Sequence, residues 1–263
     1  MAALLGAGCA TPPAGDAGRT SGAAGRVVAD SATDWAGPRY LASVDQTSWP
    51  GPKIDLLAAD TRVDPTVLLG APGDAAPLAE LYAIAPPAIA YASQAQPELY
   101  WFVADAVPHP VELRVDRGDR IEPVALLRLP PGAAAGMHCF AIGEAGGSLE
   151  HDVEHTWSVR ILADPEDPSN DPRAAAKLRV VPLPAATAAA VAAAPPAERP
   201  GVLLAAGFWY DGFALLMREL DQTGDAALAA YRQQLLSDAA VGLGEVAQAI
   251  AELPPAAARR SCR

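Results

Sequence analysis

The sequence lacks several features that would define a function directly. It has no uninterrupted run of 18 apolar residues, so we expect no transmembrane helix. Only 19 Lys and Arg residues oppose 31 Asp and Glu residues, which gives a formal net charge of −12. A basic face that could neutralise phosphates is therefore not expected, and we predict no nucleic-acid partner. Aromatic residues make up only 6% of the chain, and Cys occurs three times.

Catalytic motifs are also missing from the sequence. No Gly-x-Ser-x-Gly turn and no glycine loop followed by Lys-Ser/Thr is present, so we predict a protein that is not an enzyme and needs no cofactor. The weak metal candidates are His138, His151 and His155, which a metal-dependent hydrolase would use. His151 and His155 lie four residues apart, a spacing that suits a metal only on a helix. The flanking glycines favour a polar turn or a strand edge instead.

The N-terminus suggests export. Residues 5–9, Leu-Gly-Ala-Gly-Cys, resemble the lipobox of bacterial lipoproteins, in which Cys9 would carry the lipid. We interpret residues 1–9 as the remnant of a lipoprotein signal and residues 10–55 as a disordered tether rich in small and polar residues. The alternative is an ordinary Ala- and Gly-rich N-terminus. We expect a location in the cell envelope, either lipid-anchored or periplasmic or extracellular, with membrane contact only through Cys9.

The central part of the chain, residues 60–184, has the pattern of an antiparallel sandwich. The densest aromatic run, residues 98–103, is typical of a buried strand, and Val111, Leu113 and Val115 alternate with polar residues. Short strand-like runs separated by Pro, Gly and Asp predict an immunoglobulin-like β-sandwich. The expected strands are residues 63–69, 79–84, 99–104, 111–116, 121–129, 138–142, 156–162 and 178–183. The Asp-rich loop 164–171 is dense in Pro, which favours a rigid turn over a calcium site.

The period changes to that of helices after Pro184. Residues 185–198 form an Ala- and Pro-rich linker or helix, and the sequence does not distinguish these two. Apolar residues at helical spacing then predict a helix over 199–220, a second helix capped by Asp225, and a third over 244–253. Short connections between them indicate an antiparallel helical hairpin or small bundle in 199–253, followed by a disordered tail, 254–263. The fold class is therefore α+β.

Two aromatic clusters are the candidate binding residues. Tyr100, Trp101 and Phe102 alternate along one strand, and Trp209, Tyr210 and Asp211 are consecutive on a helix. We expect these rings to belong to the core, with one strand face against the opposite sheet and the other against the helices. The alternative is an exposed aromatic platform that binds a glycan or peptide. Cys139 and Cys262 could form a disulfide, but sequence alone does not show whether they meet.

Three stretches give the chain a family resemblance. Residues 97–102, residues 156–169 and residues 207–216, the last trailed by 241–243, occur in the order and spacing of a bacterial family that is common in cyanobacteria. The chain resembles this family, known only as domain of unknown function nine-two-eight, over about residues 60–250. The family usually has Cys before the Asp-Pro of the second stretch, where this chain has Ala163. The resemblance implies an exported envelope protein and supplies no catalytic residue.

These observations lead to one functional prediction and one alternative. We predict a non-enzymatic, exported or lipid-anchored envelope protein that acts as a protein-binding or adaptor module, with an envelope protein as its partner. The alternative is a glycan-binding module that uses exposed aromatic side chains. A metal-dependent hydrolase is a distant third, and the biological process is not predicted.

Overall fold

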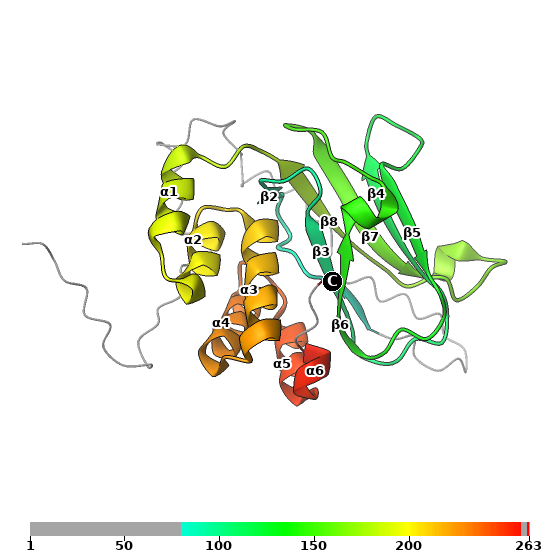
Figure 1. Cartoon of the computed structure of the whole chain (residues 1–263). Coiled ribbons are helices and arrows are strands. Elements are labelled where there is room, and N and C mark those ends of the chain that lie inside the picture. Colours follow the sequence, from blue (N-terminus) through cyan, green and yellow to red (C-terminus); the bar gives the residue numbers. More distant parts are fainter. Residues whose placement is uncertain (1–79, 259–261, 263) are drawn as a thin grey trace, which may run out of the picture. The chain divides into compact units, whose positions relative to one another are not determined.

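The computed structural model describes residues 80–258 and Cys262, all of which belong to one compact unit. The predictions for residues 1–55, for the lipid on Cys9 and for a strand over 63–69 lie outside the described residues. Within the described part, no helix is long and apolar enough to cross a membrane. The elements are strands first and helices second (Figure 1), so the α+β class is confirmed.

The strands form two sheets. A three-stranded sheet has the order β1-β3-β6, and a five-stranded sheet has the order β2-β8-β7-β4-β5. All pairs are antiparallel except β2 with β8, which is parallel. The strands are β1 (Leu81–Ala83), β2 (Ala90–Ala92), β3 (Glu98–Val103), β4 (Val111–Arg117), β5 (Ala125–Leu129), β6 (Gly136–Ala141), β7 (Glu154–Ile161) and β8 (Arg173–Val180).

The helices follow β8. They are α1 (Ala185–Ala193), α2 (Arg199–Ala205), α3 (Trp209–Thr223), α4 (Ala226–Ser237), α5 (Gly244–Glu252) and α6 (Pro255–Ala258), and short 3-10 helices occur at η1 (Ile142–Ala145), η2 (Pro168–Asn170) and η3 (Pro196–Glu198). The open choice for residues 185–198 is therefore settled as helix α1 followed by η3. The predicted cap of α4 is confirmed, because the Asp225 carboxylate accepts a hydrogen bond of 2.7 Å from the Ala227 amide.

The predicted helix over 199–220 is wrong at one point. It breaks into α2 and α3 at Gly207, whose φ of 85° lies in the left-handed region that glycine tolerates best. The Gly207 carbonyl accepts a hydrogen bond of 3.3 Å from the Tyr91 amide, so the break also contacts β2. As a result Trp209 begins a new helix, α3, and does not continue the old one.

Strands β2 and β8 also differ from the sequence predictions. β2 was not predicted, because Pro86 and Pro87 interrupt the pattern before its three residues. β8 starts at Arg173, five residues before the predicted start at Leu178. Its first half contains three consecutive Ala residues, 174–176, and Ala has low β propensity, so the sequence signal there is weak.

Both faces of β3 are buried. Tyr100 packs edge-on against Phe213 of α3 with ring centroids 5.2 Å apart, so this face of the strand meets the helices. The alternate residues Leu99, Trp101 and Val103 lie on the opposite face and are fully buried as well. Residues from both sheets and from α2 to α6 belong to one hydrophobic core. The expectation that the aromatic strand is covered on both sides is therefore confirmed.

A disulfide ties the end of the chain to the sheet. Cys139 of β6 and Cys262 are bonded, with their Cα atoms 5.1 Å apart and 123 residues between them in sequence. Cys262, four residues beyond the end of α6, thus lies at the three-stranded sheet (Figure 1). The disulfide closes a covalent loop that contains every described element between β6 and the C-terminal end of α6.

This cross-link gives the first testable prediction. Cys262→Ser should lower the free energy of unfolding by about 2–4 kcal/mol, because a bridge over a long loop restricts the unfolded chain. Urea unfolding of the oxidised protein and the variant measures the difference. Adding reductant should bring the wild type down to the variant's level. A wild type that keeps its full stability in reductant would contradict the assignment.

Candidate functional site

The predicted aromatic clusters do not form a surface. Tyr100, Trp101 and Phe102 are at most 2% exposed, and so are Trp209 and Tyr210. An exposed aromatic platform at these positions is therefore contradicted. The reason is the layering of the fold, in which β3 lies between the other sheet and the helices. These rings cannot bind a glycan at the surface of this structure, because none of the five is exposed.

The buried residues Trp209 and Tyr210 join the helices to both sheets. The Trp209 indole donates a hydrogen bond of 3.0 Å to the carbonyl of Ile84, just after β1. The Tyr210 hydroxyl accepts a bond of 2.9 Å from the Trp157 indole of β7 and donates one of 3.1 Å to the Lys177 carbonyl of β8. Burial raises the pKa of Tyr210, so its hydroxyl stays protonated and keeps its role as a donor.

Asp211 extends the same contact to β2. Its carboxylate accepts bonds of 2.7 Å from the Ser93 amide and 2.5 Å from the Ser93 hydroxyl. Burial raises the pKa of Asp211, and the two bonds from Ser93 oppose that shift. We call Trp209, Tyr210 and Asp211 the helix anchor. Its polar groups are occupied by the fold, which makes the anchor structural.

The three histidines named as weak metal candidates do not come together. His138 on β6 stacks on Trp101 with ring centroids 4.2 Å apart, and its Nε2 lies 2.7 Å from the Ala134 carbonyl oxygen. His151 is exposed, whereas His155 on β7 is only 1% exposed. Among the described residues, no group of potential ligands contains any of the three.

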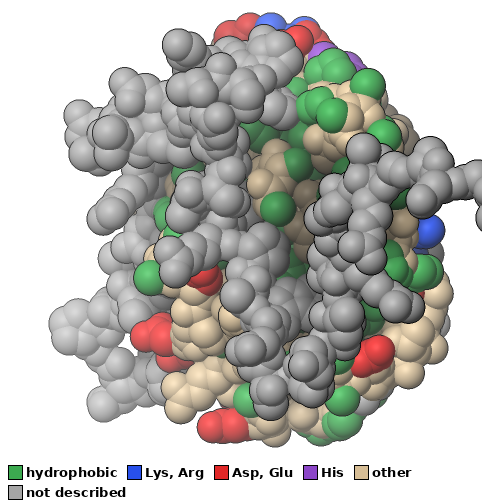
Figure 2. All heavy atoms as spheres, turned by 90° about the vertical axis from the view of Figure 1, so that its left-hand side faces the viewer, with side chains coloured by type: hydrophobic (Ala, Val, Ile, Leu, Met, Phe, Trp, Pro, Cys, Tyr) green, Lys and Arg blue, Asp and Glu red, His purple; other side chains and the backbone are tan. Residues whose placement is uncertain are grey.

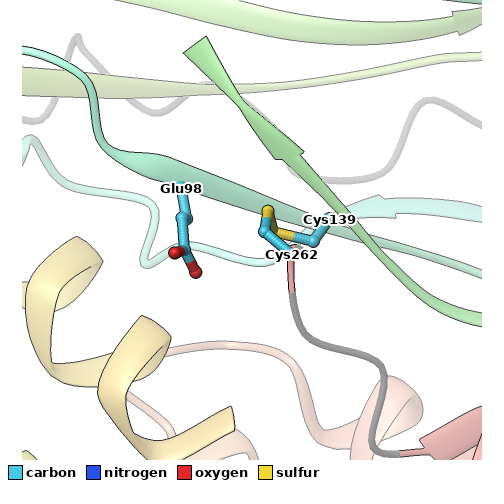
Figure 3. Close-up of side chains that lie close together, drawn as sticks. All are labelled: Glu98, Cys139 and Cys262. Atoms are coloured by element: carbon cyan, nitrogen blue, oxygen red, sulfur yellow. A yellow bond between two sulfur atoms is a disulfide. The ribbon is translucent and has the colours of Figure 1, made fainter. Parts of the chain in front are cut away.

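The one group with the spacing of metal ligands that we find in the described part is Glu98, Cys139 and Cys262, whose ligand atoms lie within 4.8 Å of one another. Figure 3 shows the Glu98 side chain beside the two bonded sulfur atoms. A disulfide has no thiolate to offer a metal. Glu98 itself accepts hydrogen bonds of 2.9 Å from Tyr100 and from Arg218 of α3. This group therefore has a structural role.

A polar cleft of about 530 Å³ lies on the five-stranded sheet, on the face that points away from the core. Its volume is within the usual range of ligand sites, about 300–1,000 Å³. β4, β7, β8 and the loop around η2 supply its walls. The lining residues are Glu112, Arg114, Asp116, Ser158, Arg160, Pro168, Ser169, Asp171 and Arg173.

Strand register places three arginines in one line across this face. Glu112 of β4 pairs with Arg128 of β5 on one side and with Arg160 of β7 on the other. Arg160 in turn pairs with Arg173 of β8. We call Arg128, Arg160 and Arg173 the arginine row. Neighbouring strands are about 4.8 Å apart, so the row crosses four strands within a short distance.

Two buried carboxylates pair with two arginines of the row, Arg128 and Arg160. Glu112 accepts 2.8 Å and 3.0 Å hydrogen bonds from Arg128 and Arg160, and Asp171 lies 3.9 Å from Arg160. The side chains of Glu112 and Asp171 are only 6% and 2% exposed, whereas Arg128 is 66% exposed and Arg160 is 30% exposed. The acids form the floor of the cleft, and the guanidinium groups face solvent. Glu112 is one of the polar residues that alternate with Val111, Leu113 and Val115, and the period-two pattern alone would place it in water, but two arginines cover it.

The loop beside the cleft is braced by hydrogen bonds from its own backbone and side chains, which fits its high proline content. The Asp171 carboxylate accepts bonds of 2.9 Å and 3.1 Å from the amides of Ala163 and Asp164. Asp167 accepts bonds from Ser169 and Asn170, and the bonds from Ser169 lower the pKa of Asp167. These carboxylates are used to shape the turn. The rigid-turn interpretation of loop 164–171 fits this pattern.

The opposite side of the molecule has a different character. Figure 2 looks onto the side on which α1 lies in Figure 1, and the described side chains visible there are mostly hydrophobic or uncharged, with scattered acidic groups and with basic groups only near the rim. No residue of α1 is buried, and its sequence is nearly all Ala. The arginine row is thus set apart from the helical side by charge.

The fold and site define a two-sheet α+β protein with helices on one side and a polar cleft on the outer face of the larger sheet. The model of the family described as Domain of Unknown Function (DUF928) matches residues 68–251, which is more than half of the chain. The chain therefore belongs to this family, and the resemblance is confirmed at that level. Among curated proteins, the sequence has no match.

The helix anchor gives a prediction of stability. Tyr210→Phe should cost about 1–3 kcal/mol of the free energy of unfolding, because the Trp157 indole and the Lys177 carbonyl both lose a partner in the core. Urea unfolding measures the loss. Tyr82→Phe is the matched control: its hydroxyl bonds the Glu245 carboxylate, which water can reach after the change. Equal losses in the two variants would contradict the special role of Tyr210.

His155 gives a prediction of pH dependence. Burial lowers its pKa, and the bond of its Nδ1 with the Val153 carbonyl opposes the shift; the nearby charges of Arg117, Glu150 and Arg120 partly cancel. The folded state thus binds this proton less readily than the unfolded state, whose pKa is about 6.5. The contribution of neutral His155 to the free energy of unfolding is therefore fully present above that pH, and it is lost as the pH drops below it.

The variant His155→Gln isolates this effect, since the other titrating groups are unchanged. We expect the free energy of unfolding of the variant, relative to wild type, to improve between about pH 7.5 and pH 5.5. Urea unfolding at both pH values gives the comparison. A difference that stays constant with pH would show that His155 titrates equally in both states.

Proposed function

We propose that this protein is a non-enzymatic, exported or lipid-anchored envelope protein that binds a protein partner through the outer face of its five-stranded sheet. The observation that carries the proposal is the cleft with its arginine row. Arginine is enriched in protein interfaces, and the buried Glu112 carboxylate restricts the side chains of Arg128 and Arg160 before binding. The polar groups of the helix anchor are bonded within the fold, so they are not available to a partner. The outer face of the five-stranded sheet, by contrast, presents charged side chains to solvent.

We also infer that the two sheets form an immunoglobulin-like sandwich. The order β1-β3-β6 corresponds to strands A, B and E of that fold, and β8-β7-β4-β5 corresponds to G, F, C and C′. In that arrangement β2 continues the first strand into the second sheet, where it pairs with β8. Binding through the G-F-C-C′ face needs no change in the core, so the surface can be specific while the fold stays the same.

A lipid on Cys9 and a location in the envelope remain part of this proposal. The support is the lipobox-like Leu-Gly-Ala-Gly-Cys sequence of residues 5–9 and the Ala-, Gly- and Ser-rich stretch after it. The disulfide between Cys139 and Cys262 is consistent with an oxidising compartment, in which such bonds persist.

Photo-crosslinking in cells tests the proposal. A crosslinking amino acid in place of Ser169, an exposed residue at the rim of the cleft, should capture a discrete protein partner. The same amino acid in place of Gln222, an exposed residue near the end of α3, is the matched control and should capture none. The product should come from the membrane fraction, and Cys9→Ser should move it to the soluble fraction. Equal capture at both positions, or none at Ser169, would contradict the sheet face as the interface.

A further inference from the structure

The arginine row has more hydrogen-bonding capacity than its own carboxylates use. A guanidinium group has five N–H donors. Arg128 donates to Glu112 through Nε, and Arg160 donates to the same carboxylate through Nη2, so several of their donors remain. Arg173 is exposed and has no ion pair within the described part of the chain. The row therefore has N–H donors that can still bind a ligand, and its three positive charges exceed the two negative charges of Glu112 and Asp171.

The floor of the cleft makes these donors suitable for recognition. The Glu112 carboxylate contacts two guanidinium groups at once, which reduces the freedom of both side chains before a ligand arrives. Guanidinium forks match carboxylates in a two-bond geometry, which gives direction as well as charge attraction. Hydrogen bonds of 2.7 Å and 2.8 Å from Arg114 to Asp116 raise the pKa of Arg114 and keep that neighbour paired. The free cationic capacity is thus concentrated in the row.

The surroundings of the row favour one kind of anion. Leu126 lies on the same face of β5 as Arg128 and is 42% exposed, and Ala175 follows Arg173 on the same face of β8. Such apolar positions beside a line of arginines suit a polypeptide segment that carries both acidic and apolar side chains. The carboxylates of Asp164 and Glu166, on the exposed loop near the cleft, disfavour a continuous polyanion such as nucleic acid.

We infer that the arginine row binds carboxylate side chains of an extended acidic segment in the partner protein. In an extended chain, alternate residues lie about 7 Å apart, which is between one and two strand spacings of the sheet. Acidic residues at alternate positions can therefore meet successive arginines of the row. This inference rests on the proposed function and adds the chemical class of the partner.

Peptide binding tests the inference with the whole protein. The probe is a fluorescent peptide of about a dozen residues that alternates Glu with Ser, and its comparator has Gln in place of every Glu. Fluorescence anisotropy should show binding of the Glu peptide only, weakened when ionic strength rises from about 50 to about 300 mM. Equal binding of the Gln peptide, or no binding of the Glu peptide, would overturn the inference.

A pair of charge-reversal variants locates the binding. Arg173→Glu should weaken binding at least about ten-fold, because it replaces an unpaired arginine of the row by a repelling carboxylate. Arg120→Glu changes the net charge by the same amount in the turn at the far end of β4 from Glu112, and should change binding by less than about two-fold. Arg128→Gln, a milder change, confirms the row if the first variant unfolds. Equal effects of the two charge reversals would mean that binding depends only on net charge, and would contradict the arginine row as the binding site.

Two outcomes separate this inference from the function on which it rests. If a polyglucuronate chain binds and the Glu peptide does not, the ligand is an acidic polysaccharide and the peptide inference is wrong. If crosslinking at Ser169 captures a partner and neither anion binds, the interface stands and only its acidic chemistry fails. Failure of both the crosslink and the peptide would remove the sheet face as an interface.

Discussion

The architecture depends on one shared hydroxyl group. Tyr210 accepts a hydrogen bond from Trp157 of β7 and donates one to the main chain of β8, inside the core. A buried hydroxyl without partners would be costly, so these bonds define one orientation of α3 on the sheets. Trp209 and Asp211 add bonds to the ends of β1 and β2 on either side of it. Three consecutive residues thus bring the start of a helix into contact with four strands or their ends.

The anchor explains why the helices and the sheets share one core. Sequence periodicity separates them into a strand-rich part and a helical part, and each has its own apolar pattern. Periodicity and local residue type correctly located most strands, the cap of α4 at Asp225 and the aromatic core, because each of these depends on neighbouring residues. The break at Gly207 and the strand β2 depend on contacts between distant segments, and they could not be read from local patterns. The break matters most, because it makes Trp209 the first residue of α3.

The arginine row could not be predicted from the sequence for a related reason. Arg128, Arg160 and Arg173 are distant in the chain, and only the register of four strands aligns them. A shift of one residue in any of these strands would turn its arginine toward the core. The net charge of −12 also concealed the row, since a total says nothing about how charges are distributed. The candidate binding residues predicted from the sequence were the aromatic clusters instead, and their rings are buried.

The two sets of residues differ in what they can say about function. Trp157 and the helix anchor lie within the stretches through which the chain resembles its family, and in this chain they hold the fold together. Family membership here is therefore information about architecture. Two arginines of the row neutralise the buried Glu112 carboxylate, and the remaining N–H donors of the row are directed to the outer face of the sheet, where a partner could reach them. Under the proposed function, the residues that determine specificity should accordingly be sought on the outer face of the five-stranded sheet, among side chains that face solvent.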